Sequence, residues 1–426
     1  MAQPSARGQQ ERRFFSVVRG NARVIAITEG VAAVSFQWFR TYASLYMVAL
    51  GVTAVQLGWL ESVLIFTQFV STLMGGYFAD RFGRKRVLVV FDILCWGVPM
   101  ALYAVARNPW YFLIGRFING FVYIVIPSFQ CLFVEDVPAE HRAAVFRMVQ
   151  FLTSGARLLT PAAGWLVALI GIVPAGRIFA AIVMVSSVGI AIFRQFALRE
   201  TSMGAARMVD TLDLAPRDMA REYLAAFKLM WRDRRIGLFM MVRNLVAFST
   251  VIWTTYSAIY LTDGRGIGLS DATVALFPFV SAVVTMVIII LPVVQRQGRR
   301  EFGGLIAGQV LSVIAGFSFA VSPTGTVWWA VLWAIGSAAS VAVFRPANDS
   351  YWANIIGDRE RALIFSVSSA LTALITLPAA PLAGLLYTTS PRAPFALGIA
   401  VQLVALGLTV LLLRGAPGRT ATQPSQ

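Results

Sequence analysis

Charged side chains lie within long apolar segments of this chain, and they are the residues best suited to chemistry. They are Glu29, Arg40, Glu61, Asp92, Arg116, Arg157, Arg243, Arg345 and Asp349. If such segments cross a membrane, each central arginine costs about 2.5–3.5 kcal/mol on insertion scales, so it should face a wet cavity or an acidic partner. A guanidinium binds oxyanions through two parallel hydrogen bonds. Free arginines in a cavity would therefore bind a carboxylate, phosphate or sulfate.

The first apolar segment carries two of these charges on one helical face. Glu29 and Arg40 are about three helical turns apart, with Gln37 not far around the helix. Nearby aromatic residues could pack against an organic solute. We predict these substrate-binding residues: Arg40, Gln37, Arg157, Arg345, Tyr42 and Tyr256. Two alternatives stay open. The arginines could pair with Glu61, Glu29 and Asp349 to hold helices together, and the aromatic residues could be interfacial anchors.

The motifs limit which source of energy the protein could use. No G-x-x-x-x-G-K-(S/T) phosphate loop occurs, so ATP is not expected to drive the protein. No metal-ligand cluster or nucleophilic constellation is visible, and we expect no cofactor and no enzyme activity. A proton gradient is the simplest remaining source. Glu29 and Glu61 are the predicted proton carriers, because a carboxyl group in an apolar cavity can titrate near neutral pH. Asp92 is interpreted as a helix-end group only.

Composition predicts the elements that must hold these residues. Of 426 residues, 58% are hydrophobic and 13% are charged, whereas soluble proteins carry roughly 25% charge. Apolar stretches of about 20 residues can cross a bilayer as helices. We therefore predict an all-α integral membrane protein with twelve helices at 24–49, 55–78, 86–106, 109–134, 144–170, 172–196, 236–261, 269–294, 302–321, 326–352, 362–388 and 392–414.

The basic residues predict the orientation of these helices. The net charge of +16 is spread in short clusters between apolar segments, which argues against nucleic-acid binding. Lys and Arg concentrate in alternate loops, so both termini are expected in the cytosol of a multi-pass protein of the plasma or inner membrane. The expected parts are a tail 1–23, a six-helix bundle 24–197, a linker 198–235 with an amphipathic helix, a second bundle 236–414 and a tail 415–426.

The two bundles resemble each other in sequence. TYASLYM at 41–47 matches TYSAIYL at 255–261, RAAVF at 142–146 matches RALIF at 361–365, and DRFGRK at 80–85 matches QRQGRR at 295–300. The three matches keep their order and nearly the same shift. Parallel six-helix repeats of this kind form transporters whose substrate lies between the halves.

Two motifs then carry a family resemblance. GYFADRFGRKRVL at 76–88 resembles the loop signature of the major facilitator superfamily, departing only at Phe78, and GRFINGF at 115–121 resembles its fourth-helix motif. The resemblance covers about residues 24–414. It implies a central cavity and alternating access. The fifth-helix antiporter motif is absent in its strict form. GARLLTPAAG at 155–164 is the nearest segment.

The loop motif implies a conformational latch. Its predicted members are Gly76, Asp80, Arg81, Gly83, Arg84 and Arg116. Asp80 would face the positive end of the eleventh helix near Arg361, an interaction of about 0.3–1 kcal/mol at a surface. Arg84 would hold the carboxylate, and the glycines would allow close approach and a tight turn. The alternative is that the cluster only sets topology. For Arg116 a structural role is favoured.

These observations predict a secondary active transporter of a small organic solute. Proton coupling, export and an anionic or zwitterionic substrate are favoured. The alternatives are a multidrug/H⁺ antiporter for apolar cations, a lipid translocator, and a membrane sensor on the same fold. The expected partners are the solute, protons and the lipid bilayer, with no nucleic acid, and the protein is expected to be a monomer.

Overall fold

The computed structural model describes residues 20–134, 137, 139–210, 233–290, 301–355 and 361–414. Predictions for the N-terminal tail up to residue 19, the amphipathic helix of the linker, the loop around Gln295 and the C-terminal tail lie outside these residues. The described residues are helical, with short turns between the helices and no strand.

The described chain makes twelve long helical passes, several of them interrupted by a 3₁₀ or π turn. In the first half they are α2 (Gly20–Ala49), α3 (Ala54–Phe82), α4–η1–α5 (Arg84–Asp92, Ile93–Gly97, Val98–Ala104), α6–η2–α7 (Pro109–Gly120, Phe121–Ile124, Val125–Val134), α8–η3–α9 (Ala139–Ala156, Arg157–Leu159, Thr160–Ile170) and α10 (Ile172–Ala197). In the second half they are α13 (Arg234–Thr262), η5–α14 (Asp271–Ala275, Leu276–Ile290), α16 (Glu301–Ala320), α17 (Val327–Ile355), α18–α19 (Arg361–Thr376, Ala379–Thr389) and α20 (Ala393–Arg414). A short helix, α11 (Ser202–Asp210), follows α10.

These passes confirm the predicted all-α membrane fold. Within the described residues, ten helices are long and apolar enough to cross a membrane. The two passes outside that set are α2 and α8–η3–α9. They carry Glu29, Gln37, Arg40 and Arg157, so polar residues that face the interior interrupt their apolar runs.

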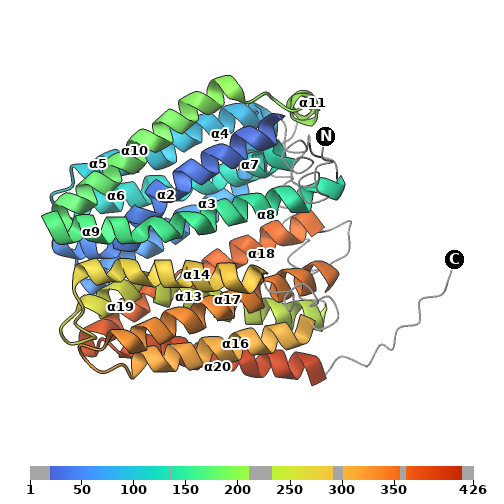
Figure 1. Ribbon diagram of the computed structural model, residues 1–426. Coiled ribbons are helices and arrows are strands. Elements are labelled where there is room, and N and C mark those ends of the chain that lie inside the picture. The colour runs from blue at the N-terminus through green and yellow to red at the C-terminus, as the bar shows by residue number, and fades with distance from the viewer. Residues whose placement is uncertain are drawn as a thin grey trace, which may run out of the picture.

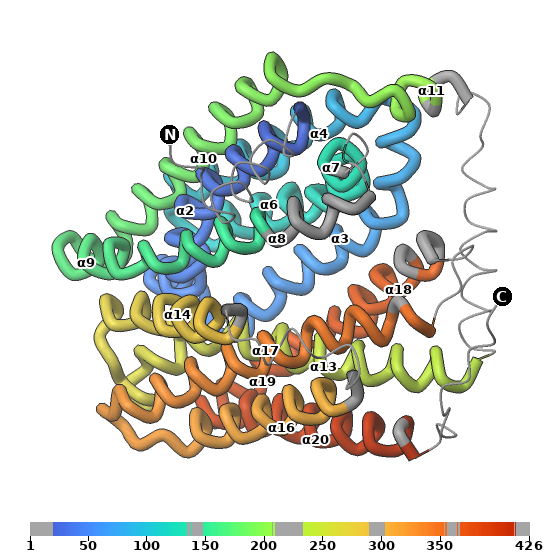
Figure 2. The backbone as a smooth tube through the Cα atoms, turned by 45° about the vertical axis from the view of Figure 1, so that its right-hand side comes forward, coloured from blue at the N-terminus to red at the C-terminus, as the bar shows by residue number. Residues whose placement is uncertain are grey.

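The helices form two layers. Figure 1 shows α2 to α10 above and α13 to α20 below, with the helices running across the view. The turn at Gly83 joins α3 to α4 on the right, where α2 begins and α20 ends; we call this the motif end. The turns at Gly51 and Gly171 lie at the opposite end, which we call the far end. Figure 2 shows α9 beside α14 toward the far end.

The largest buried apolar cluster joins the two halves toward the far end. It includes Tyr42, Phe179, Tyr256, Phe319 and Phe395. The predicted aromatic group around Tyr42 and Tyr256 belongs to this core. Fixed ring contacts occupy it: the ring centroids of Tyr42 and Phe179, for example, are 5.8 Å apart. Packing of aromatic side chains therefore helps to close this end of the molecule.

Hydrogen bonds between the halves also lie toward the far end. The Tyr42 hydroxyl donates to the carbonyl of Ala272 at 3.3 Å, and the Tyr256 hydroxyl lies 2.9 Å from the carbonyl of Ala54. Each tyrosine thus reaches the first turn of the second pass of the other half. Among the described residues, no hydrogen bond or ion pair joins the halves near Gly83. The structure is therefore closed at the far end.

Candidate functional site

A cavity of about 290 Å³ is lined by residues of the first half, several of them charged, and we call it cavity A. It is lined by parts of α2, α4, η1, α8, η3 and α10. Four predicted site residues line it: Glu29, Gln37, Arg40 and Arg157. The Gln37 amide donates to the Thr41 hydroxyl at 3.2 Å. The shared face of Glu29 and Arg40 on α2 is confirmed, because both contact the same space.

Arg40 and Arg157 bring positive charge into cavity A without a fixed partner. Neither guanidinium makes a hydrogen bond or ion pair with a described residue. Arg157 is within electrostatic range of both Arg40 and Arg345. The alternatives in which Arg40 pairs with Glu61 and Arg345 pairs with Asp349 are wrong for this conformation. Asp349 instead accepts from the Asn348 amide at 2.9 Å. Arg345 lines neither cavity described here.

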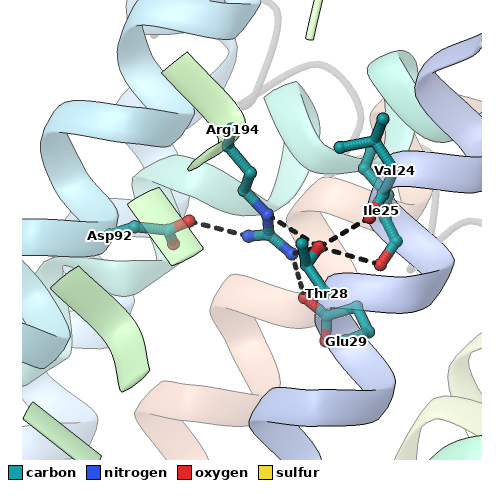
Figure 3. A network of polar contacts seen from close by, with 6 residues as sticks. All are labelled: Val24, Ile25, Thr28, Glu29, Asp92 and Arg194. Carbon is teal, nitrogen blue, oxygen red and sulfur yellow. Dashed lines mark hydrogen bonds and ion pairs between the residues drawn. The ribbon is translucent and has the colours of Figure 1, made fainter. Parts of the chain in front are cut away.

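A buried charge network stands at one side of cavity A (Figure 3). Arg194 of α10 forms ion pairs with Glu29 at 2.7 Å and with Asp92 at 2.8 Å. Its Nε and one terminal nitrogen also donate to the Thr28 hydroxyl, at 3.0 and 2.8 Å. One guanidinium thus serves two carboxyl groups. Arg194 is 3% exposed, which requires such partners.

Two charged members of this network were not predicted as site residues. Asp92 is not a simple helix-end group, because it is buried and paired with Arg194. Arg194 lies in the last turn of α10, where a basic residue commonly marks the cytosolic end of a membrane helix. The sequence signal for Arg194 was the presence of Glu29 and Asp92 within apolar helices, since acidic groups inside a membrane need a cation as partner.

A second cavity of about 390 Å³, cavity B, lies beside the first and reaches the second half of the chain. Thr254 and Thr255 of α13 line it together with residues of α2, α3 and α6. Arg116 pairs here with Glu61 at 3.3 Å, each side chain being about one-fifth exposed. Arg116 was predicted as part of the latch. It lies instead in the cavity wall, consistent with the structural role that was favoured for it.

Tyr42 and Tyr256 line neither cavity. They are 1% and 0% exposed, so the predicted solute contact is not made in this conformation. Their place is the joint between the halves described above. Arg243 also stays outside the cavities. Its guanidinium stacks on Trp352, 4.8 Å from the ring centroid.

The loop motif is held by the segment that follows α10. Gly83 has φ 84°, which confirms the predicted tight turn. The Arg84 guanidinium donates to the Thr201 hydroxyl at 3.0 Å, and the Lys85 amide donates to the Glu200 carboxylate at 3.0 Å. Arg84 therefore does not hold Asp80, contrary to the prediction. Asp80 makes no hydrogen bond or ion pair with a described residue.

The other latch positions also differ from expectation. Arg81 donates to the hydroxyl of Tyr77 at 2.6 Å, a contact within one helix. The glycine of close approach is Gly75, where an added Cβ would lie 3.1 Å from the Tyr123 carbonyl, whereas Gly76 has open space around it. The predicted partner at the start of α18 begins with Arg361, whose side chain lies outside those described. The contact of the motif with this partner therefore lies outside the described residues, and the latch stays a prediction.

Comparison with known proteins places the chain in a family. The family model described as Major Facilitator Superfamily matches residues 25–303, well over half of the chain. The chain belongs to the major facilitator superfamily. Its members' twelve-pass fold agrees with the two-layer arrangement, and a multi-pass membrane transporter follows from the family.

Individual relatives of this superfamily member are distant. It is 21% identical over 376 residues to multidrug resistance protein 2 of Bacillus subtilis, covering 86% of this chain and 88% of the relative. It is 25% identical over 242 residues to the probable sulfoacetate transporter SauU of Cupriavidus necator, covering 55% of each. The xylose transporter XylE of E. coli, in a partially occluded inward open conformation, has a TM-score of 0.68 at 14% identity over 95% of this chain and 99% of that chain.

Proposed function

We propose that this protein moves a small organic anion across the cell membrane by alternating access of its two halves. The observation that carries this proposal is the pair Arg40 and Arg157. Both line cavity A without a described partner. The positive charge of Arg345, in the second half, is within electrostatic range of Arg157. An oxyanion between them would satisfy guanidiniums that are otherwise costly to hold in a membrane.

Proton coupling through Glu29 completes the proposal. Glu29 shares Arg194 with Asp92, so it can accept a proton while Arg194 keeps a carboxylate partner. Glu61 is the less suitable proton carrier, because its protonation would leave Arg116 without a carboxylate partner among the described residues. If the basic loops lie in the cytosol, as the charge distribution predicts, the motif end is the inner side and this conformation faces inward. We propose export in exchange for protons, by a monomer.

The relatives support transport and leave two substrate classes to compare. The name of the Cupriavidus necator relative, a probable sulfoacetate transporter, concerns a doubly charged organic anion. The name of the Bacillus subtilis relative favours a second candidate, export of varied drugs. The positive charge of Arg40 and Arg157 opposes apolar cations as substrates, and this favours the anion.

Reconstituted vesicles test the proposal. Purified protein in proteoliposomes is screened by counterflow with radiolabelled sulfoacetate, benzoate and tetraphenylphosphonium, with and without an imposed pH gradient. We expect counterflow of at least one anion, and its accumulation only when the gradient is present. Movement of tetraphenylphosphonium alone would establish the second candidate. Anion counterflow that ignores the pH gradient in every assay would remove proton coupling while leaving the anion as substrate.

A further inference from the structure

Cavities A and B meet at three side chains. Phe36, Arg40 and Trp96 line both spaces, and no other described residue does so. Phe36 and Arg40 come from α2, and Trp96 comes from the π turn η1. A solute that occupies the space shared by the two cavities would touch this junction.

The junction combines two ring systems with an unused cation. The rings of Phe36 and Trp96 meet edge to face, with centroids 4.3 Å apart. Both residues are only partly buried. Within the described part of the chain, the Trp96 indole N–H has no acceptor and the Arg40 guanidinium has no acidic partner. Two ring systems, one N–H donor and one guanidinium therefore remain available to a ligand.

The backbone around Trp96 is held in an unusual form. Residues Ile93–Gly97 make a π turn inside the third pass, and π turns of this kind often occur at functional sites. The turn is tied to the fourth pass, because the buried Asn119 amide donates to the carbonyl of Cys95 at 2.8 Å. Asn119 belongs to the segment GRFINGF. It is a positioning residue for the neighbouring Trp96.

We propose that the junction of Phe36, Arg40 and Trp96 selects organic anions that carry an aromatic ring. The anionic group accepts hydrogen bonds from the Arg40 guanidinium and the Trp96 indole N–H. The ligand ring packs against the Phe36 and Trp96 rings, where aromatic partners gain over aliphatic ones of the same size. This inference rests on the proposed transport of an organic anion and names its chemical class.

Calorimetric titration of the purified full-length protein tests this with three probes of similar shape. Benzoate has the ring and the charge, cyclohexanecarboxylate has the charge only, and benzamide has the ring only. We expect benzoate to bind about three- to tenfold more tightly than cyclohexanecarboxylate, as for other aromatic pairs, and benzamide to bind more weakly than either anion.

Variants separate the two contributions of Trp96. Trp96→Leu should reduce the benzoate preference to near one. Trp96→Phe keeps a ring and loses the N–H, so it should keep the preference while weakening both anions. Trp165→Leu is the matched control, since Trp165 is 67% exposed on the outside of the bundle, and it should change neither value. If Trp96→Leu does not fold, Phe36→Leu should reduce the preference in the same way.

The outcomes distinguish this inference from the proposed function. Equal affinity for benzoate and cyclohexanecarboxylate in the unmodified protein would overturn the aromatic selectivity and leave anion transport standing. An unchanged preference in Trp96→Leu together with Phe36→Leu would also overturn it. If neither benzoate nor cyclohexanecarboxylate bound, and sulfoacetate showed no counterflow in vesicles, the proposed function itself would fail.

Discussion

Gly384 of α19 lies directly against Tyr256 of α13, at the joint between the halves. A Cβ at Gly384 would be 2.7 Å from the Tyr256 hydroxyl and 2.7 Å from the carbonyl of Ala54 in the other half. The first half repeats the arrangement, because a Cβ at Gly164 would be 2.7 Å from the carbonyl of Ala272 and 3.3 Å from the Tyr42 hydroxyl. The sequence repeat thus has a structural counterpart in two glycine–tyrosine joints.

Gly384→Ala is predicted to open the far end. The added methyl group cannot fit beside a backbone carbonyl of the other half, so the conformation closed at that end becomes less stable. Double electron–electron resonance between nitroxide labels at positions 107 and 265 would report the separation of the halves. The labels are placed in a variant with Cys95 and Cys131 replaced by serine. We expect a longer mean distance.

The control is Gly407→Ala, because Gly407 has no atom within 4 Å of an added Cβ. It should leave the distance distribution unchanged. A distribution in Gly384→Ala that matched both this control and the parent protein would show that the joint does not hold the far end closed.

Glu29→Gln is predicted to uncouple transport from protons. Loss of its charge leaves Arg194 paired with Asp92 at 2.8 Å, so the fold should persist while the proposed proton carrier is gone. In vesicles, exchange of the solute should continue, and accumulation driven by a pH gradient should stop.

Glu61→Gln provides the comparison. It leaves Arg116 without its partner, so it should lower the melting temperature, and Arg116→Gln added to it should restore part of the loss. Accumulation by Glu29→Gln at the rate of the parent protein would assign the proton to another group.

Asp80→Asn and Glu200→Gln should act in different ways. Asp80 has no described partner in this conformation, whereas Glu200 accepts from the Lys85 amide. We therefore expect Asp80→Asn to keep the melting temperature of the parent protein and to slow transport, because the latch predicted for Asp80 would form only when the motif end closes. Glu200→Gln should lower the melting temperature. Transport by Asp80→Asn at the parent rate, measured with matched protein amounts, would remove the latch.

The sequence was sufficient for the fold because membrane-spanning helices leave long apolar runs and sharp charged turns. It also predicted that Gln37, Arg40 and Arg157 face a cavity, since polar and charged side chains in apolar helices must turn away from lipid. It did not reveal Arg194, because an arginine in the last turn of a helix has the same sequence appearance whether it anchors or pairs.

The remaining differences between the sequence predictions and the structure come from contacts that depend on conformation and on local helix geometry. Tyr42 and Tyr256 could face a solute or the other half, and periodicity does not distinguish these. The π turn at Ile93–Gly97 changes the helical phase between Asp92 and the rest of its pass, so an ideal 100° step misplaces that face. Partners such as the Asn119 amide, which fixes the turn, lie on another helix.

The most direct test of the central claim is the apparent affinity for anions, taken from the concentration dependence of transport by Arg40→Ala in proteoliposomes, with benzoate and sulfoacetate as solutes. Loss of a charge-assisted hydrogen bond worth about 1.5–3 kcal/mol should reduce apparent affinity for both by about one to two decades. Arg40→Lys should recover part of it, because a lysine keeps the charge and loses the bidentate geometry. Arg265→Ala, at an exposed far-end position, should behave as the parent protein. Unchanged affinity for both anions in Arg40→Ala and in Arg157→Ala would contradict the account.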